Sequence, residues 1–144
     1  MAEAVLKDLL RIENLTDKVY VDSCATANYH VGEDPNPYAL EILRRHGLDS
    51  NHRARVIEMK DFSDFDMILG MDSNNIYKIT SVGKHAQWKG INMKSTIKRL
   101  GSYDPHEVLD VYDPYCGEIE DFEECYQHVS RCCKQFLKSV ASEL

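Results

Sequence analysis

The chain has 144 residues, of which 43% are hydrophobic and 28% charged, and its formal net charge is -7. This length predicts a single domain over residues 1–144 with the composition of a soluble globular protein. The acidic balance argues against nucleic acid as a partner, because phosphate backbones are bound by an excess of lysine and arginine. No apolar run is long enough to span a membrane and no secretory signal opens the chain, so we expect a cytoplasmic protein.

The first elements in chain order are a helix and a short strand. Met1, Val5 and Leu9 recur at helical spacing, and acidic residues precede basic ones, as the helix dipole prefers. The run 19–21 is rich in β-branched and aromatic residues and is followed by a small, polar loop over 23–28. This pattern predicts a strand that ends in a loop.

The middle of the chain alternates between helix and strand signals. Asn36 and Pro37 form a helix start, and Gly47 marks its end. The segment 65–71 is the most hydrophobic in the chain and predicts a buried parallel strand. Ser73 could cap the helix that follows.

The second half is expected to hold a long polar loop over 81–93, a last strand over 96–100 and a final helix over 118–144. The apolar arc of that helix consists of Phe122, Cys125, Val129, Cys132, Cys133, Phe136 and Val140. Its opposite side carries Glu123, Gln127, Arg131, Lys134 and Lys138. Alternating strands and helices predict an α/β fold with a small parallel sheet flanked by helices on both faces.

Asp113 is the leading candidate for a catalytic group. It precedes Pro114, which restricts the backbone, and it lies between Tyr112 and Tyr115. A stiffly held carboxyl group beside aromatic rings suits a general acid that protonates an aromatic leaving group. A plain surface turn is the alternative, and the similar Tyr103-Asp104-Pro105 stretch serves as an internal comparison.

Several stretches together carry a family resemblance. They are Met1–Val5, Val21–Thr26, Tyr29–Gly32, His52–Arg55, Asp61–Phe62, Phe65–Leu69, Leu100–Pro105, Asp113–Tyr115, Asp121–Glu123 and Arg131–Cys133. In this order they resemble the low-molecular-weight protein tyrosine phosphatases across essentially the whole chain. The resemblance implies the phosphotyrosine phosphatase I fold and hydrolysis of phosphotyrosine through a cysteinyl-phosphate intermediate, without metal or cofactor. Its substrates would be phosphotyrosine-bearing proteins or small aryl phosphates.

The resemblance also implies roles for individual residues. Asp113 would be the general acid, and Tyr115 and Tyr29 would form opposite walls of the substrate pocket. Cys116 stands where the family usually has a second tyrosine, which weakens one wall.

Three further residues match family positions that brace the phosphate-binding loop. They are Ser23, His52 and Asp72. Their alternative roles are a strand-end serine, a satisfied histidine and a helix cap. Arg53 and Arg55 are interpreted as solvated charges.

The family's nucleophile lies in a Cys-x5-Arg-Ser-Pro loop directly ahead of the first helix, and the 144 residues do not include it. A phosphate dianion needs backbone N–H groups and a guanidinium to hold it, and a phenolate leaving group needs an acid. We therefore expect this chain to lack both the nucleophile and the first central strand. Either the written amino terminus is internal to a longer, active enzyme, or the chain is an inactive relative that acts through protein–protein interaction.

Other interpretations remain open at this stage. Cys125 and Arg131 have the phosphatase spacing but fall within the final amphipathic helix, which uses its own amides. Cys125, His128 and Cys132 could hold zinc, although core packing explains them better. A receiver-like domain would bind Mg²⁺ through clustered carboxylates, of which Asp72 is the one candidate.

The remaining expectations concern thiols and assembly. The five cysteines are expected to be reduced, and Cys24 and Cys116, both on loops, are the ones most open to oxidation. An unpaired strand edge inside the sheet would favour a homodimer.

Overall fold

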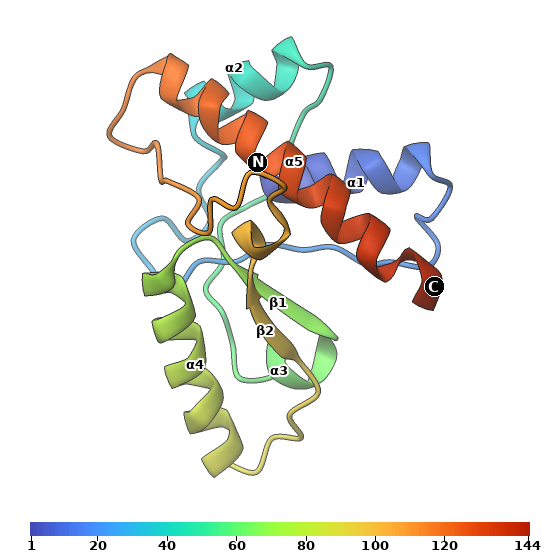
Figure 1. Ribbon diagram of the computed structural model, residues 1–144. Helices are drawn as coiled ribbons and strands as arrows, with labels where there is room; N and C mark the ends of the chain where they lie inside the picture. The colour runs from blue at the N-terminus through green and yellow to red at the C-terminus, as the bar shows by residue number, and fades with distance from the viewer.

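The computed structural model describes residues 1–144 and has an α/β architecture (Figure 1). Two parallel strands, β1 (Met67–Gly70) and β2 (Thr96–Arg99), form the sheet and are connected by helix α4 (Ser73–Trp88). Met67 lies opposite Thr96, and Gly70 lies opposite Arg99. The predicted small parallel sheet and its last strand are therefore confirmed.

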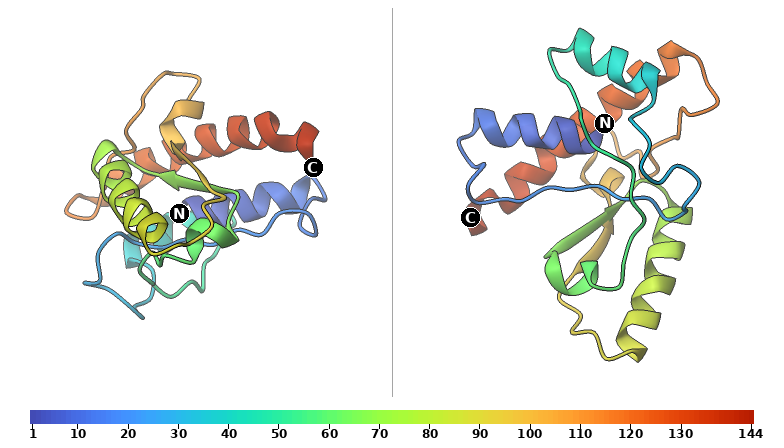
Figure 2. Two further views of the ribbon diagram at one scale, coloured as in Figure 1. Left: turned by 90° about the horizontal axis from the view of Figure 1, so that it is seen from below. Right: turned by 180° about the vertical axis from the view of Figure 1, so that it is seen from behind.

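The other helices are α1 (Ala2–Ile12), α2 (Pro37–Arg45), α3 (Asp61–Asp64) and α5 (Ile119–Val140), with short 3-10 turns at Leu100–Tyr103 and Ala141–Glu143. α1, α2 and α5 lie together in the upper half of Figure 1, whereas α4 lies in the lower half, and the right view of Figure 2 shows the same separation from behind. None of these helices combines the length and the hydrophobicity that a membrane-spanning helix needs.

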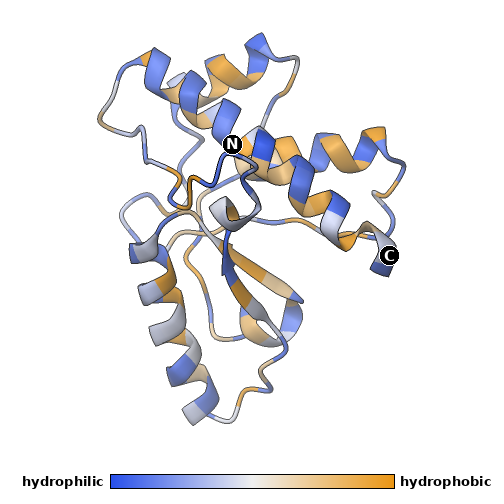
Figure 3. Ribbon diagram, viewed as in Figure 1, coloured by the Kyte–Doolittle hydropathy of each residue, from blue (hydrophilic) through white to orange (hydrophobic).

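Helices cover both faces of β1. Met67 and Leu69 pack against the large core cluster built from α1 and α5. Ile68 packs against the second cluster, which includes Phe62 of α3 and Ile79 of α4. Successive side chains of a strand point to opposite faces, so the apolar run of β1, hydrophobic in Figure 3, serves two cores.

Local signals explain where the helices begin and end. The Asn36 side chain accepts a hydrogen bond from the Tyr38 N–H at 2.8 Å, and Gly47 has a φ of 75°, which suits glycine after a helix. Asp72 caps α4, because its Oδ1 accepts from the Asn75 N–H at 2.7 Å. The cap is thus Asp72 and not Ser73.

The predicted loop over 81–93 is wrong over most of its length, because α4 continues to Trp88. Ile79, Gly83 and Ala86 form the buried stripe of this helix. A Cβ on Gly83 would lie 3.0 Å from the Phe62 ring, so a larger residue there would have to displace that ring. Because the buried residues Gly83 and Ala86 are small, this segment carries little apolar signal in the sequence.

The predicted strand over 19–21 is also wrong, because these residues belong to no strand. The only pairing near them is an isolated bridge between Ala25 and Val56. β1 pairs with β2 on one edge only, and Met67, Ile68 and Leu69 are half-buried where full burial was predicted. A β-rich sequence cannot form a strand without a neighbour to bond to.

Candidate functional site

The main cavity of the protein lies between residues 18–31, β1, α1 and α5. It has a volume of about 990 Å³ and is lined by 39 residues, of which 25 are hydrophobic. Asp113 and Tyr29 both line it, together with the loop 22–27. The structure therefore places the predicted acid and one predicted pocket wall at the same cavity.

The carboxylate of Asp113 is held by its own turn. Its Oδ1 accepts a hydrogen bond from the Tyr115 N–H at 3.0 Å, and Pro114 between them is buried. Asp113 itself is exposed. An exposed but oriented carboxyl group can exchange a proton with a group in the cavity.

The two predicted pocket walls are brought into one neighbourhood by His30. The His30 and Tyr115 rings have centroids 5.4 Å apart at an interplanar angle of 46°. Tyr29 and Tyr115 are 83% and 57% exposed, so both rings have free surface for a ligand. Cys116, which stands where the family usually has a second tyrosine, is also exposed.

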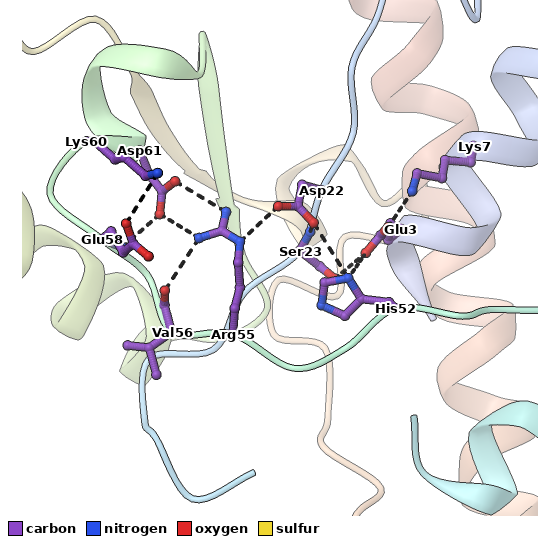
Figure 4. Close-up of polar contacts among 10 residues, drawn as sticks. All are labelled: Glu3, Lys7, Asp22, Ser23, His52, Arg55, Val56, Glu58, Lys60 and Asp61. Atoms are coloured by element: carbon purple, nitrogen blue, oxygen red, sulfur yellow. Dashed lines mark hydrogen bonds and ion pairs between the residues drawn. The ribbon is translucent and has the colours of Figure 1, made fainter. Parts of the chain in front are cut away.

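Figure 4 shows that Ser23 and His52 meet through Glu3. The Ser23 hydroxyl donates to Glu3 Oε2, and His52 Nδ1 lies 3.1 Å from the same oxygen and 3.6 Å from Asp22 Oδ1. Lys7 pairs with the other Glu3 oxygen. Glu3, Asp22 and Ser23 line the cavity, so this cluster forms a polar wall beside the apolar space.

Arg55 is not the solvated charge that we predicted. Its guanidinium binds Asp61 Oδ2 at 2.9 Å, Asp61 Oδ1 at 3.2 Å and Asp22 Oδ2 at 2.8 Å. Asp61 is only 4% exposed, and its hydrogen bonds to Arg55 raise the pKa of the guanidinium against the effect of burial. Burial opposes the charge of Asp22, but hydrogen bonds from Arg55 and from the Ser23 N–H outweigh it and lower the pKa of Asp22. Arg53, in contrast, is exposed and pairs with Asp34.

Asp72 is placed away from this cluster. It caps α4 through Asn75 and does not line the cavity. Of the three predicted bracing residues, the structure brings Ser23 and His52 together and leaves Asp72 with a local role.

The cavity in this chain is a poor site for a phosphate dianion. Its acidic lining residues are Glu3, Asp22, Asp61, Asp64, Asp66, Asp113 and Glu143. Its basic ones are Lys18 and Arg55, and Arg55 is fully engaged. Phosphate binding here needs a further source of N–H donors or positive charge.

Cys125 and Arg131 lie within α5, as the amphipathic pattern predicted. Arg131 binds both oxygens of Asp104, at 3.0 and 3.1 Å. Burial raises the pKa of Cys125 to about 11, with the Asp113 charge adding to the effect. A protonated thiol and an occupied guanidinium do not form an anion-binding nucleophile.

Two side-chain clusters have the spacing of metal ligands. Asp104, His128 and Cys132 form one, and Glu3, Asp22 and His52 form the other. In the first, Asp104 is saturated by Arg131, the His128 Nε2 lies 3.0 Å from the Val108 carbonyl oxygen, and burial raises the pKa of Cys132 to about 11. In the second, Arg55, Lys7 and Ser23 already occupy the carboxylates. Neither donor set is free for a metal.

The cysteines differ enough in environment to predict their reactivity. Cys116 and Cys24 are exposed, although burial of the thiol raises the pKa of Cys24. Burial raises the pKa of Cys133 to about 12. We expect iodoacetamide at neutral pH to alkylate Cys116 first, Cys24 second and the three cysteines of α5 only after denaturation, as followed by peptide mass spectrometry. Early alkylation of Cys132 or Cys133 in the folded chain would contradict this order.

Comparison with known proteins identifies the family. The family model "Low molecular weight phosphotyrosine protein phosphatase" matches residues 1–144. The chain belongs to this family. The phosphatase of that name from Sus scrofa is 41% identical over 140 residues, covering 97% of this chain and 86% of the relative. The Homo sapiens phosphatase of the same name is 38% identical with the same coverage.

Solved structures agree with the family assignment. A drosophila arginine phosphatase is 34% identical with a TM-score of 0.87, covering 96% of this chain and 87% of that one. A protein tyrosine phosphatase from Entamoeba histolytica also has a TM-score of 0.87, at 24% identity, covering 99% and 88% of the two chains, and supports the fold alone. Because the phosphatase family model matches residues 1–144, the receiver-like alternative is rejected.

Glu3 and Asp61 are the residues of the polar wall that the sequence did not single out. An acidic residue in the first turn of a helix is explained by the dipole alone, and Glu3 gave no other signal. Asp61 is the buried partner that holds the half-buried Arg55 guanidinium, and only its place in a stretch resembling the family pointed to it.

Proposed function

We propose that this chain supplies the acid and the ring-binding walls of a phosphotyrosine phosphatase site. Asp113 donates a proton to the leaving phenolate, and Tyr29 and Tyr115 contact the aromatic ring. The observation that carries the proposal is that Asp113 and Tyr29 line one cavity while His30 links the Tyr115 ring to the Tyr29 loop. Family membership supports the reaction class.

The chemistry explains why such a site needs a fixed acid. When a thiolate attacks phosphorus in line, the bond from phosphorus to the phenol oxygen breaks and a phenolate with a pKa of about 10 leaves. Proton donation from Asp113 to that oxygen lowers the barrier. The resulting Asp113 carboxylate then accepts a proton from the water that hydrolyses the cysteinyl phosphate.

The attacking thiolate and the phosphate-holding N–H groups belong to the Cys-x5-Arg-Ser-Pro loop of the family. The one Cys-x5-Arg spacing within the 144 residues is the helical pair Cys125 and Arg131. The proposal therefore assigns the loop to sequence joined ahead of Met1. The substrates are phosphotyrosine-bearing proteins or small aryl phosphates, and Cys116 gives one side of the pocket less ring contact than a tyrosine would.

A catalytically inactive relative is the second candidate. The acidic lining of the cavity favours it for the 144 residues by themselves, because a phosphate dianion would be repelled. In that case the exposed Tyr29 and Tyr115 would contact partner proteins directly.

The test compares two chains. The 144-residue chain should not turn over p-nitrophenyl phosphate, whereas the same chain preceded by an apolar strand and a Cys-x5-Arg-Ser-Pro loop should, and replacing the loop cysteine with serine should abolish turnover. The coding sequence upstream of Met1 gives a direct check of whether such a loop exists.

Turnover by the 144-residue chain alone would contradict the assignment of the nucleophile. A folded extended chain without activity would support the inactive relative. A phosphoarginine peptide belongs in the assay because one structural relative is an arginine phosphatase. Its preferential hydrolysis would move the substrate class away from phosphotyrosine.

A further inference from the structure

We propose that the solvent-exposed side of α4 binds the surface of a bilayer that contains anionic phospholipids. This side, the α4 outer face, consists of Tyr77, Lys78, Lys84, Trp88 and Lys89. The inference concerns peripheral binding alone and does not depend on the proposed phosphatase activity.

The first argument is the uneven distribution of charge along the chain. Residues 73–103 hold six of the 17 lysines and arginines and none of the 24 aspartates and glutamates, although the whole chain has a net charge of -7. Lys78, Lys84 and Lys89 are exposed, and none of them pairs with a carboxylate; the lysines that do are Lys7, Lys60 and Lys94. Unpaired cations on one face attract an anionic surface that comes within a Debye length of about 8 Å.

The second argument is that exposed aromatic rings lie among these lysines. Tyr77 is 76% and Trp88 78% exposed. Together with Lys84 they occupy helix positions i, i+7 and i+11, which share one side, and the buried stripe that includes Ile79 and Ala86 lies on the other. Tryptophan and tyrosine favour the headgroup region of a bilayer, because their rings are apolar and carry one polar group.

The third argument is the position of Trp88 in the molecule. It is the last residue of α4, and this end of the helix is the part of the molecule farthest from α1, α2 and α5 in Figure 1 and in the right view of Figure 2. The His85 ring stacks on Trp88 with centroids 6.0 Å apart, and Lys89 Nζ lies 5.1 Å from the Trp88 ring centroid. A ring at this tip can enter the headgroups while the acidic helices stay in water.

Other anionic partners fit this face less well. Its five residues line neither the main cavity nor the cavity beside the first half of α5, whereas a peptide is usually held in a groove. Tyr77 and Trp88 are about 16 Å apart along the helix, which is too far for neighbouring bases of a single strand to stack on both. A bilayer surface requires neither a groove nor a fixed spacing of rings.

The experiment sediments the 144-residue chain with vesicles of phosphatidylcholine alone or of phosphatidylcholine with about 30% phosphatidylserine. We expect binding to the anionic vesicles only, and its loss when the salt is raised from about 0.05 M to 0.5 M. The triple variant Lys78→Gln, Lys84→Gln and Lys89→Gln should bind about 10- to 100-fold more weakly, because each lysine contributes to the attraction.

A matched control removes the same charge elsewhere. It replaces Lys60, Lys134 and Lys138, all exposed and outside α4, with glutamine. This variant should retain at least about half of the binding, because charges beyond a Debye length from the bilayer are screened. Circular dichroism of both variants checks that they fold.

Trp88 reports on its own position, because it is the single tryptophan of the chain. Its fluorescence should shift to shorter wavelength with anionic vesicles and should be quenched by brominated lipids. Equal binding to the two vesicle types, equal weakening in the two triple variants, or an unshifted Trp88 emission would each overturn the proposal. Binding of polyuridylate or of an oligoglutamate peptide without binding of vesicles would assign the face to another anionic partner and would also overturn it.

Discussion

Replacing Asp113 with asparagine is expected to slow hydrolysis of phenyl phosphate about 10²- to 10⁴-fold in a chain that carries the nucleophile loop. The amide keeps the size of the carboxyl group and the hydrogen bond from the Tyr115 N–H at 3.0 Å, but it has no acidic proton for the leaving oxygen. The measurement is kcat for a series of aryl phosphates. The loss should be smaller for p-nitrophenyl phosphate, whose leaving group is a weaker base.

The leaving-group trend separates an acid catalyst from a structural residue. Asp110→Asn is the matched control, because Asp110 pairs with Arg99 at 2.9 Å and lies three positions away without lining the cavity. It should leave the trend unchanged. A uniform loss for all leaving groups would contradict the proposed role.

The helices were predicted well wherever one face is apolar over several turns. α1, α2 and α5 follow from their apolar spacing and end signals, which are local properties of the sequence. α4 was missed in its second half because Gly83 and Ala86 are small and neighbouring residues are polar. Its packing against Phe62 is a tertiary contact that periodicity does not reveal.

The strand signals were less reliable because pairing is not local. The segments 19–21 and 65–71 both have β-rich sequences, but only the second has a neighbour, β2, to bond to. β2 is the one strand that pairs with β1, whose residues Met67, Ile68 and Leu69 are half-buried and line the cavity. The sequence pattern therefore located segments of high β propensity, but it could not show which of them pair into strands.

In the site, too, local sequence predicted some features, whereas long-range contacts decided others. The resemblance placed Tyr29, Tyr115 and Asp113 in loops that the structure brings close, whereas Arg53 and Arg55 looked alike in sequence and differ in space. Arg55 is held half-buried in an ion pair by Asp61, six positions further on, and Arg53 remains exposed. Which of two neighbouring cations is drawn into the ion-pair network depends on the turn that brings Asp61 back to it.

Asp104 and Asp113 make the contrast sharper still. Both follow a tyrosine and precede proline, but Asp113 is exposed at the cavity and Asp104 is 6% exposed beneath α5. Arg131, 27 positions away, holds both Asp104 oxygens, and the His106 N–H donates to Oδ1 at 3.1 Å. The local motif is the same, and the long-range partner decides whether the aspartate is buried in an ion pair or exposed at the cavity.

Asp104→Asn is consequently expected to lower the free energy of unfolding by about 3–5 kcal/mol, because it leaves the half-buried Arg131 without its carboxylate. Asp110→Asn removes an exposed pair with Arg99 and should cost about 0–1 kcal/mol. Urea unfolding at pH 7 measures both. Equal effects would show that the Asp104 pair contributes no more than a surface one.

The pH dependence of the unfolding free energy provides an independent test of the Asp104–Arg131 pair. The Arg131 hydrogen bonds, against the opposing effect of burial, hold the pKa of Asp104 well below its usual value. A carboxyl group with a lowered folded-state pKa contributes stability that is complete above the unfolded pKa of about 3.9 and is lost as the pH falls toward the folded value. The unfolding free energy of the natural chain should therefore decline below about pH 4, and Asp104→Asn should decline less steeply than Asp110→Asn over that range. Parallel declines in the two variants would mean that Asp104 is not the residue whose protonation destabilises the fold.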